Sequence, residues 1–453
     1  MPIYNAPIQD MKFILNDVFN AADFWQKNEQ LAHVDSDTVN MILEEMSKFA
    51  KNTLLPINRS GDEEGAQYLG EGKVKTPTGF KAAFDEYAQG GWIGLGGDPN
   101  HGGQGMPKMV TMLAEEMVFT ANQSFALYPN LSGGACMCIY NAGSEEQKQT
   151  YLEKIYSGEW TGTMCLTEPH AGTDLGIIKT KAVPNEDGSY NITGTKIFIT
   201  AGEHDLADNI IHLVLAKTPD APAGSKGISL FIVPKFHVNA DGSLGERNAV
   251  SCGSIEHKMG IKASATCVMN FDGAKGFMVG AENTGLASMF IMMNYERLTM
   301  GLQGIGGAEL AYQNATAYTL DRIQGRADSG IQEPNKAADP IVFHADVRRM
   351  LLNAKTISEA SRCFAMYVAK ELDTNKYTDD AAARKAADDR VALLTPVAKA
   401  FLTDRGLEAS IDAQQCFGGH GYIREWGMEQ IVRDTRISQI YEGTNGIQSL
   451  DLL

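Results

Sequence analysis

Hydrophobic residues recur at helical spacing over the first third of the chain. Ile42, Met46, Phe49 and Ala50 lie at positions i, i+4, i+7 and i+8, which places them on one face of an α-helix. Two Gly-rich stretches break this part of the chain into shorter pieces. The pattern predicts a mostly helical domain over residues 1–160.

The pattern changes between residues 161 and 280. This stretch is rich in β-branched and aromatic residues, and Gly, Pro, Asn and Asp divide it into short segments. The most strand-like segments are SYNITGTKIFIT, NIIHLVLAKT, GISLFIVPKF and TCVMNFDG. Since no helical pattern separates them, we predict a β domain, either a sandwich or a barrel, in preference to a parallel sheet.

Helical spacing returns over residues 281–453. Leu286, Met289, Phe290 and Met293 mark one face, and long amphipathic runs with few helix breakers follow. Such runs predict an antiparallel bundle similar to a four-helix bundle. The whole chain is therefore predicted to be a multidomain α+β protein, in the order helical domain, β domain, helical bundle.

Composition narrows the classes of function. The 453 residues carry 39 Lys and Arg against 56 Asp and Glu, and the formal net charge of −17 argues against a binder of nucleic acid or of anionic membranes. No apolar stretch reaches the roughly 18 residues of a membrane span, and the N-terminus resembles no secretory signal or transit peptide, so we expect a cytoplasmic protein without a membrane span. The seven cysteines form no C-x-x-C pair, so we expect buried thiols and no metal site.

Several common site motifs are missing from the sequence. There is no G-x-G-x-x-G that follows a strand and opens a helix, no G-x-x-x-x-G-K-[ST], no G-x-S-x-G and no H-E-x-x-H. Their absence argues against a Rossmann dinucleotide fold, a P-loop NTPase, a serine hydrolase and a zinc protease.

Four other segments combine small residues with a few polar ones: MCLTEPHAGTD, KIFITAG, QQCFGGHGYIREWGMEQIVRDTRI and QIYEGTNGIQ. Gly and Ala allow close backbone approach, and Thr hydroxyls offer donors to a flat ligand with polar edges. As a set, and in this order, the segments resemble the acyl-CoA dehydrogenase family of flavoproteins over residues 40–450. The extension over residues 1–40 resembles that of a larger bacterial subgroup. Members with this extension normally continue into another helical domain. We expect that this chain either lost that domain by truncation or never had it.

The resemblance implies a binding site for FAD. Leu166 and Thr167 are expected at the pyrimidine side of the flavin ring, Phe198 over one face of it, and Thr200 near N5, while Thr173 is expected to reach the pyrophosphate or the CoA arm. Donors near N5 and the pyrimidine oxygens stabilise the reduced flavin.

FAD in this family lies at a subunit contact, which implies a homodimer or homotetramer. Arg322, Gln415, Gly418 and Gly419 are expected to reach the adenosine half of a neighbouring subunit's FAD, where Arg322 supplies a cation for the phosphates. Thr444 is expected to add a cofactor contact beside the catalytic base.

Removing the α-proton of a thioester requires a carboxylate above that carbon and donors to the enolate-like oxygen. By resemblance, Glu442 in the YEGT segment is the base, and its own amide is one of those donors. Burial in an apolar pocket would raise its pKa. Glu296, in an ERL segment, matches the position that other members use; it stays the alternative base, and otherwise pairs with a nearby cation or lines the pocket. The residues expected to contact substrate are Thr173, Arg297, Tyr441 and Gly443.

The implied reaction is the α,β-dehydrogenation of an acyl-CoA to a trans-2-enoyl-CoA, as in fatty acid β-oxidation. Glu442 takes the α-proton, the β-hydride passes to flavin N5, and the electrons go on to an electron-transfer flavoprotein. Fatty acyl-CoA of medium or long chain is the favoured substrate. The alternatives are a 3-(methylthio)propanoyl-CoA dehydrogenase and an acyl-CoA oxidase that reduces O₂. A third hypothesis is a non-catalytic flavoprotein that binds nucleic acid, as in one branch of the family. The net charge of −17 and the intact YEGT segment argue against it.

Overall fold

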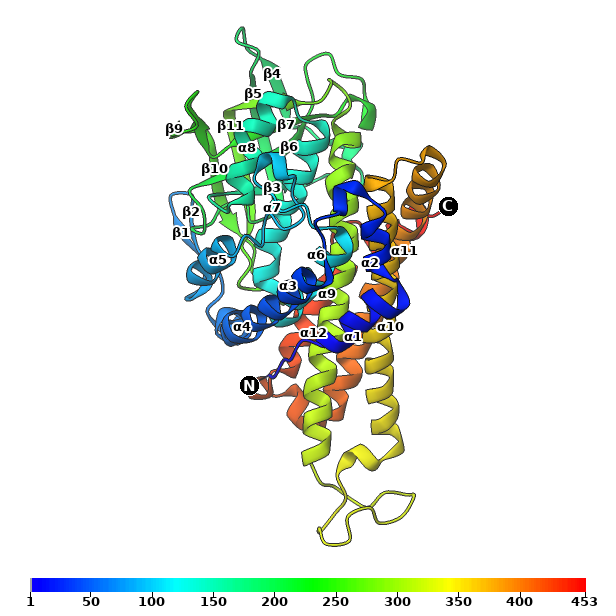
Figure 1. Cartoon of the computed structure of the whole chain (residues 1–453). Coiled ribbons are helices and arrows are strands. Elements are labelled where there is room, and N and C mark those ends of the chain that lie inside the picture. The colour runs from blue at the N-terminus through cyan, green and yellow to red at the C-terminus, as the bar shows by residue number, and fades with distance from the viewer. Residues whose placement is uncertain (1) are drawn as a thin grey trace.

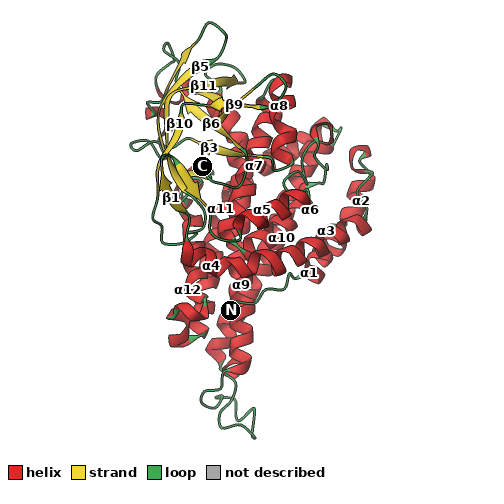
Figure 2. Cartoon of the chain, turned by 90° about the vertical axis from the view of Figure 1, so that its left-hand side faces the viewer, coloured by secondary structure: helices red, strands yellow, loops and turns green. Residues whose placement is uncertain are grey.

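Helices form both ends of the chain and a β-sheet forms its middle, as Figure 1 shows for the computed structural model, which describes residues 2–453. The predicted order of helical, β and helical parts is confirmed. In Figure 2 the strands gather at the upper end of the molecule, and helices fill the rest. Within residues 2–453, none of the helices combines the length and the apolar character needed to cross a membrane.

The N-terminal helices follow the spacing read from the sequence. Met46, Phe49 and Ala50 are buried, and Ile42 is partly buried. The elements are α1 (Ile8–Phe13), α2 (Ala21–Gln26), α3 (Ser36–Phe49), α4 (Leu55–Glu64), the hairpin of β1 (Gln67–Gly70) and β2 (Lys73–Lys75), α5 (Phe80–Gln89), α6 (Lys108–Ala121), α7 (Gln123–Ala142) and α8 (Glu145–Tyr156). Nearly every residue of α6 is buried, and so is most of α7. The reason is that α6 packs between α3 and the C-terminal helices α9 and α10, whereas α7 packs between strand β3 and α9.

The sheet has seven strands in the order β3-β6-β7-β11-β5-β4, with β10 also paired to β11. Only the β3–β6 pair is parallel, which agrees with the predicted preference against a parallel sheet. The strands are β3 (Trp160–Cys165), β4 (Lys181–Pro184), β5 (Tyr190–Thr200), β6 (Asn209–Ala216), β7 (Ser229–Pro234), β10 (Val250–Ile255) and β11 (Thr266–Val279), and β8 (Phe236–Val238) pairs with β9 (Leu244–Arg247) outside this sheet. The long strand β11 joins the two halves of the sheet, because its first part pairs with β5 and β10 and its last three residues pair with β7.

Three long helices dominate the C-terminal part. The elements are α9 (Gly285–Asp321), α10 (Ala345–Tyr377), α11 (Ala381–Cys416), α12 (Met428–Arg436) and α13 (Asn445–Asp451). Glycines let α9 and α11 pack closely, because a Cβ atom on Gly406 would lie only 2.3 Å from the Gly304 carbonyl oxygen. Helix α9 packs on α6 and α7, and α10 also packs on α6, so both helices link the bundle to the N-terminal part.

Candidate active site

The loop after β3 and the last part of strand β5 lie beside each other and form a wall of the β part. Leu166 and Thr167 directly follow β3, and the Thr167 carbonyl accepts a hydrogen bond of 2.9 Å from the Ile197 backbone N–H on β5. The next residue, Phe198, has φ +59° and leaves 59% of its surface exposed. A bulky residue at positive φ is uncommon, and such conformations cluster at functional sites. The wall therefore presents an exposed aromatic ring next to Thr167, which suits the flat ring of a flavin.

A buried ion pair between Lys196 and Glu168 holds the loop after β3 in place. The Lys196 ammonium group, fully buried, donates 2.9 Å hydrogen bonds to both the Leu166 carbonyl and the Glu168 carboxylate. Burial alone would raise the pKa of Glu168, but Lys196 and hydrogen bonds from Thr180 and Lys179 hold it below its usual value. Glu168 lies in the TEPHAGTD segment and Lys196 in the KIFITAG segment, two of the segments that resemble the family. The sequence did not indicate that these two residues form an ion pair.

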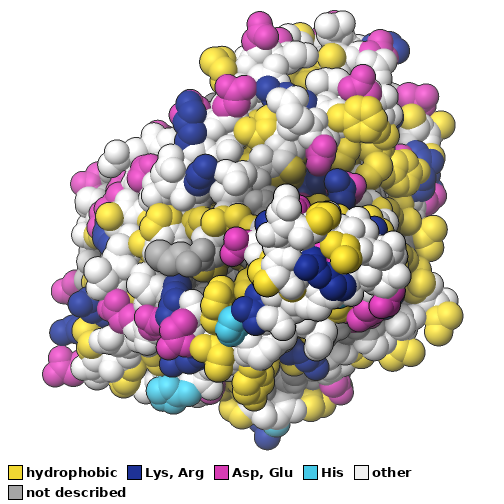
Figure 3. All heavy atoms as spheres, turned by 90° about the horizontal axis from the view of Figure 1, so that it is seen from below, with side chains coloured by type: hydrophobic (Ala, Val, Ile, Leu, Met, Phe, Trp, Pro, Cys, Tyr) yellow, Lys and Arg dark blue, Asp and Glu magenta, His cyan; other side chains and the backbone are white. Residues whose placement is uncertain are grey.

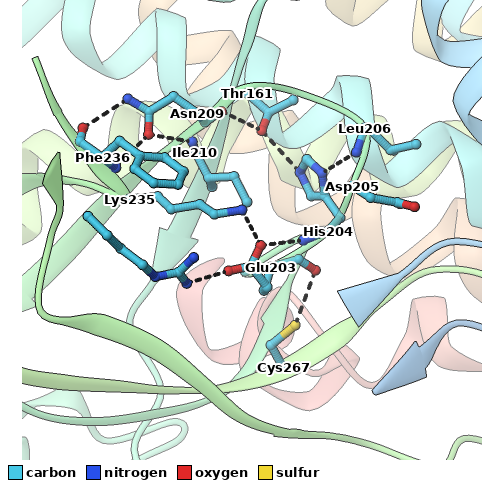
Figure 4. Close-up of polar contacts among 12 residues, drawn as sticks. Thr161, Glu203, His204, Asp205, Leu206, Asn209, Ile210, Lys235, Phe236 and Cys267 are labelled. Carbon is cyan, nitrogen blue, oxygen red and sulfur yellow. Dashed lines mark hydrogen bonds and ion pairs between the residues drawn. The ribbon is translucent and has the colours of Figure 1, made fainter. Parts of the chain in front are cut away.

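The residues that follow Thr200 are held by a polar cluster shown in Figure 4. The Glu203 carboxylate is buried and accepts from the Lys235 ammonium and, at 2.9 Å, from the Arg247 guanidinium. Thr200 itself accepts a 2.6 Å hydrogen bond at its carbonyl from the Thr163 hydroxyl. These contacts hold in place the backbone at which the resemblance puts flavin N5.

His204, beside Glu203, is a structural residue. Its Nδ1 accepts from the Leu206 backbone N–H at 3.1 Å, and its Nε2 lies 3.0 Å from the Thr161 hydroxyl (Figure 4). Burial lowers the pKa of His204 to about 3, so the ring stays neutral at physiological pH.

The YEGT segment forms a tight turn before α13. Glu442 has φ +55° and Gly443 has φ +77°. A Cβ atom on Gly443 would lie 2.5 Å from the Gln448 amide nitrogen, which donates 3.1 Å to the Gly443 carbonyl, so only glycine fits this position. Thr444 then caps α13 by accepting from the Ile447 backbone N–H at 3.3 Å. The turn projects the Glu442 carboxyl from a rigid backbone.

Two cations act on the Glu442 carboxyl. Burial raises the pKa of Glu442 to about 7, against the opposing effect of Lys399 and Arg297. Lys399 is fully buried on α11, donates 2.9 Å to the Asn445 side-chain oxygen, and has a pKa that burial lowers to about 8. The guanidinium group of Arg297 pairs with Asp451 of α13 at 2.8 Å. The site thus holds a carboxyl group poised to exchange a proton near neutral pH.

Two residues expected to contact substrate are engaged inside the protein. Arg297 ties α13 to α9 through Asp451, and it is nearly fully buried. The Tyr441 hydroxyl donates 2.6 Å to the Gln303 side-chain oxygen, within the helical bundle. Thr173, the third such residue, lies in an exposed loop after β3.

Glu296 lies near Glu442 but in different surroundings. It is 1% exposed, and its Oε2 accepts a short hydrogen bond from the Asn130 amide on α7. Burial, and after it the Glu442 carboxyl, raise the pKa of Glu296 well above its usual value. Glu296 makes no ion pair with any of residues 2–453, so the alternative in which it pairs with a nearby cation is wrong.

A cavity of about 600 Å³ lies between α6, α7, α9 and α10. Its wall includes Asn130 and Gly133 of α7 and Tyr295 of α9, next to Glu296. An ion pair between Lys108 and Glu115, 2.6 Å long, also lines it, and the Tyr295 hydroxyl donates 2.8 Å to Glu115. The cavity is of the size of small-ligand sites, and it combines apolar walls with a few polar groups.

The residues expected at the adenosine half of FAD form a separate group. Arg322 is exposed at the C-terminal end of α9, and Gln415, Gly418 and Gly419 are exposed at the end of α11. Arg322 follows Glu296 by 26 residues on one helix, so roughly 39 Å separates them along its axis. The structure therefore does not bring this group to the Glu442 site of the same chain.

The surface near this second group is open. A Cβ atom on either Gly418 or Gly419 would meet nothing within 4 Å, and Tyr422 nearby is 84% exposed. The end of α11 lies low in Figure 1, and Figure 3, which views the molecule from that side, shows hydrophobic side chains among charged ones. The two glycines leave the backbone open beside the exposed ring of Tyr422.

A β-sheet lies between two helical parts, an exposed aromatic ring stands on the wall of the β part, and two carboxyl groups of raised pKa, Glu442 and Glu296, lie near each other. This combination is what a flavin-dependent acyl-thioester oxidoreductase requires. Family models agree over nearly the whole chain: the acyl-CoA dehydrogenase N-terminal domain matches residues 36–159, the middle domain 163–274 and the C-terminal domain 283–453. The chain belongs to the acyl-CoA dehydrogenase family. Membership confirms the expected enzyme class, an oxidoreductase that uses FAD.

The chain is also similar to individual proteins of known sequence and structure. The chain is 44% identical to the 3-methylmercaptopropionyl-CoA dehydrogenase of Ruegeria pomeroyi, over 99% of this chain and 76% of that protein. Its fold is similar to an acyl-CoA dehydrogenase of Bacillus anthracis solved in complex with FAD (TM-score 0.76, 25% identity, 93% of this chain and 66% of that one). It is also similar to a chain from the structural work on the electron transferring flavoprotein of Acidaminococcus fermentans and flavin-based electron bifurcation (TM-score 0.75, 27% identity, 92% and 97%).

Proposed function

We propose that the protein oxidises a short acyl-CoA to its trans-2-enoyl-CoA, with Glu442 as the base that removes the α-proton. The observation that carries this proposal is the Glu442 carboxyl, held by a rigid turn with a pKa of about 7. A base with a pKa near the working pH is both ionised and able to hold the proton. The Glu442 backbone N–H bonds to no group of residues 2–453, so it is free to donate to the thioester oxygen as negative charge develops there.

FAD would be held by the wall of the β part. Phe198 would cover one ring face, Leu166 and Thr167 would contact the pyrimidine edge, and Thr200 would lie near N5. When bound, FAD supplies the two-electron acceptor for the hydrogen that leaves the β-carbon. Gln415 and the other exposed residues at the end of the bundle would bind the adenosine half of a second subunit's FAD, which supports a homodimer or homotetramer.

The cavity supports a short acyl group. The Lys108–Glu115 ion pair and the Tyr295 hydroxyl lie in its wall, and a long alkyl chain would have to cover these charged groups, at a cost in desolvation. The similarity to a 3-methylmercaptopropionyl-CoA dehydrogenase supports 3-(methylthio)propanoyl-CoA in particular. This choice favours the alternative substrate over the medium or long fatty acyl chains that the family resemblance alone suggested.

A panel of thioesters tests the substrate. We expect kcat/KM for 3-(methylthio)propanoyl-CoA and butyryl-CoA to exceed that for palmitoyl-CoA by at least about tenfold, which corresponds to about 1.4 kcal/mol of transition-state binding. Turnover with an artificial electron acceptor and anaerobic bleaching of the flavin provide the two measurements. A maximum at palmitoyl-CoA would contradict the short-chain proposal.

The same turnover assay can also identify the electron acceptor. We propose an electron-transfer flavoprotein as the acceptor, which the similarity to the Acidaminococcus structure supports. Hydrogen peroxide formed in air at the full rate, with no acceptor added, would identify the oxidase instead.

The pH dependence of kcat/KM tests Glu442 and its cations. Because the base must be ionised, we expect kcat/KM to fall as the pH drops through about 7. Lys399→Met removes a positive charge that lowers the pKa of Glu442, so the midpoint should move to higher pH. The matched control is Lys385→Met, at an exposed lysine of the same helix that pairs with Asp389, and it should leave the midpoint unchanged. A midpoint that moves to lower pH in Lys399→Met would refute this account.

A further inference from the structure

Glu296 and Asn130 form a buried side-chain pair between α9 and α7. The Asn130 Nδ2 donates to Glu296 Oε2, and both side chains are more than nine-tenths buried. The other oxygen of each group, Glu296 Oε1 and Asn130 Oδ1, is also buried and has no partner among residues 2–453. Buried polar atoms without partners are rare, and each needs an explanation.

Among residues 2–453, no cation forms an ion pair with Glu296. Lys108, which acts on it, is paired with Glu115 at 2.6 Å. Arg297, the next residue along the helix, is paired with Asp451 at 2.8 Å. An ionised carboxylate that is buried without a counter-ion is costly, and such a group usually takes up a proton instead.

The ionisable groups around Glu296 oppose a negative charge there. The Glu442 carboxyl, from the turn before α13, and the Glu115 carboxyl, from α6, both raise the pKa of Glu296 beyond the larger effect of burial. Tyr295 and Tyr441 also face it, and burial raises the pKa of each well above its usual value, so both are neutral. Among the charged groups with the largest effects on this pKa, Lys108 is the one that favours the ionised form.

The free oxygen of Glu296 packs directly on the backbone of α7. A Cβ atom on Gly134 would lie 2.5 Å from Oε1 and 3.0 Å from the Met292 side chain. Glycine at this position lets the helix approach the carboxyl group, which leaves no room on that side for a water molecule to act as a partner.

We propose that Glu296 is a neutral carboxylic acid that forms two hydrogen bonds with the Asn130 amide and so keeps a second negative charge away from Glu442. The Nδ2 of Asn130 donates to Oε2, and a proton on Oε1 donates to Asn130 Oδ1, so a single proton satisfies both unpartnered atoms. Glu296 then adds no second negative charge to the site, which leaves Glu442 free to ionise near neutral pH. The second part of this inference rests on Glu442 being the base.

Infrared difference spectroscopy on the FAD-loaded enzyme tests the proton directly. The variant Glu296→Gln is a close match, because a Gln amide can make the same two hydrogen bonds with Asn130. Wild type minus Glu296→Gln, recorded about one pH unit above the pKa of Glu442, should show the C=O stretch of a protonated carboxyl group. The control difference with Glu442→Gln should show this band only at lower pH. A carboxylate band in place of the protonated one would overturn the proposal.

The pH profile of kcat/KM tests the effect on Glu442. Since Glu296→Gln exchanges one neutral group for another, we expect its midpoint to stay where it is in the wild type. Asn130→Asp adds an acidic group to the pair and should raise the midpoint by about one pH unit, which is a tenfold loss of rate below it. A midpoint lowered by Glu296→Gln would mean that Glu296 had been ionised, and would refute the proposal. If instead Glu442→Gln remains active, the proposed function fails while the infrared result for Glu296 still stands.

Discussion

Replacing Glu442 with Gln is expected to reduce turnover by roughly 10²–10⁴-fold, the range in which general bases contribute. The amide has the same shape but cannot accept the α-proton, and the turn that projects it depends on Gly443 and Gln448, which the change leaves intact. We expect the variant to keep its FAD and its melting temperature, and to bind acyl-CoA without bleaching the flavin. Turnover, flavin absorbance after anaerobic addition of substrate, and thermal unfolding provide the measurements.

Glu296→Gln is the matched control for this result. It makes the same change of carboxyl to amide in a residue close to Glu442, and we expect it to retain most of the activity. If Glu296→Gln were the inactive variant and Glu442→Gln the active one, the assignment of the base would have to be reversed. Comparable losses in both variants would indicate that the two carboxyl groups share the proton transfer, which contradicts a neutral Glu296.

Replacing Lys196 with Met is expected to destabilise the protein by about 3–5 kcal/mol, the cost of removing one partner of a buried ion pair. The change leaves the Glu168 carboxylate without its cation and the Leu166 carbonyl without its donor. Since both of these groups belong to the loop beside Phe198, we also expect the variant to lose FAD during purification. The melting temperature and the ratio of flavin to protein absorbance measure the two effects.

Two further variants separate the ion pair from a general effect of losing a lysine. Lys81→Met removes a lysine from an exposed pair with Asp85, and it should cost less than about 1 kcal/mol. The double change of Lys196→Met with Glu168→Gln removes the buried charge as well, so it should recover part of the lost stability and flavin. A Lys196→Met protein with an unchanged melting temperature and full flavin content would show that the pair does not support the wall.

Much of the candidate site was visible in the sequence because its residues sit in short segments with a characteristic order. The segments TEPHAGTD and KIFITAG predicted the residues of the wall of the β part, and YEGT predicted Glu442 as the base. The residues that set the pKa values of the two carboxyl groups could not be predicted in this way. Lys399 lies 43 positions before Glu442 and Asn130 lies 166 positions before Glu296, and nothing in the local pattern links the members of either pair.

The sequence by itself determined the order of helices and strands, the family, and the two carboxyl groups that could act as the base. Hydrophobic spacing sets helices and strands locally, so this level can be read residue by residue. Only the tertiary structure decided how the two carboxyl groups differ. Burial and nearby charges set a pKa, and both depend on which helices pack together. Lys399 and Arg297 act on Glu442, whereas Asn130 and Gly134 of α7 lie against Glu296.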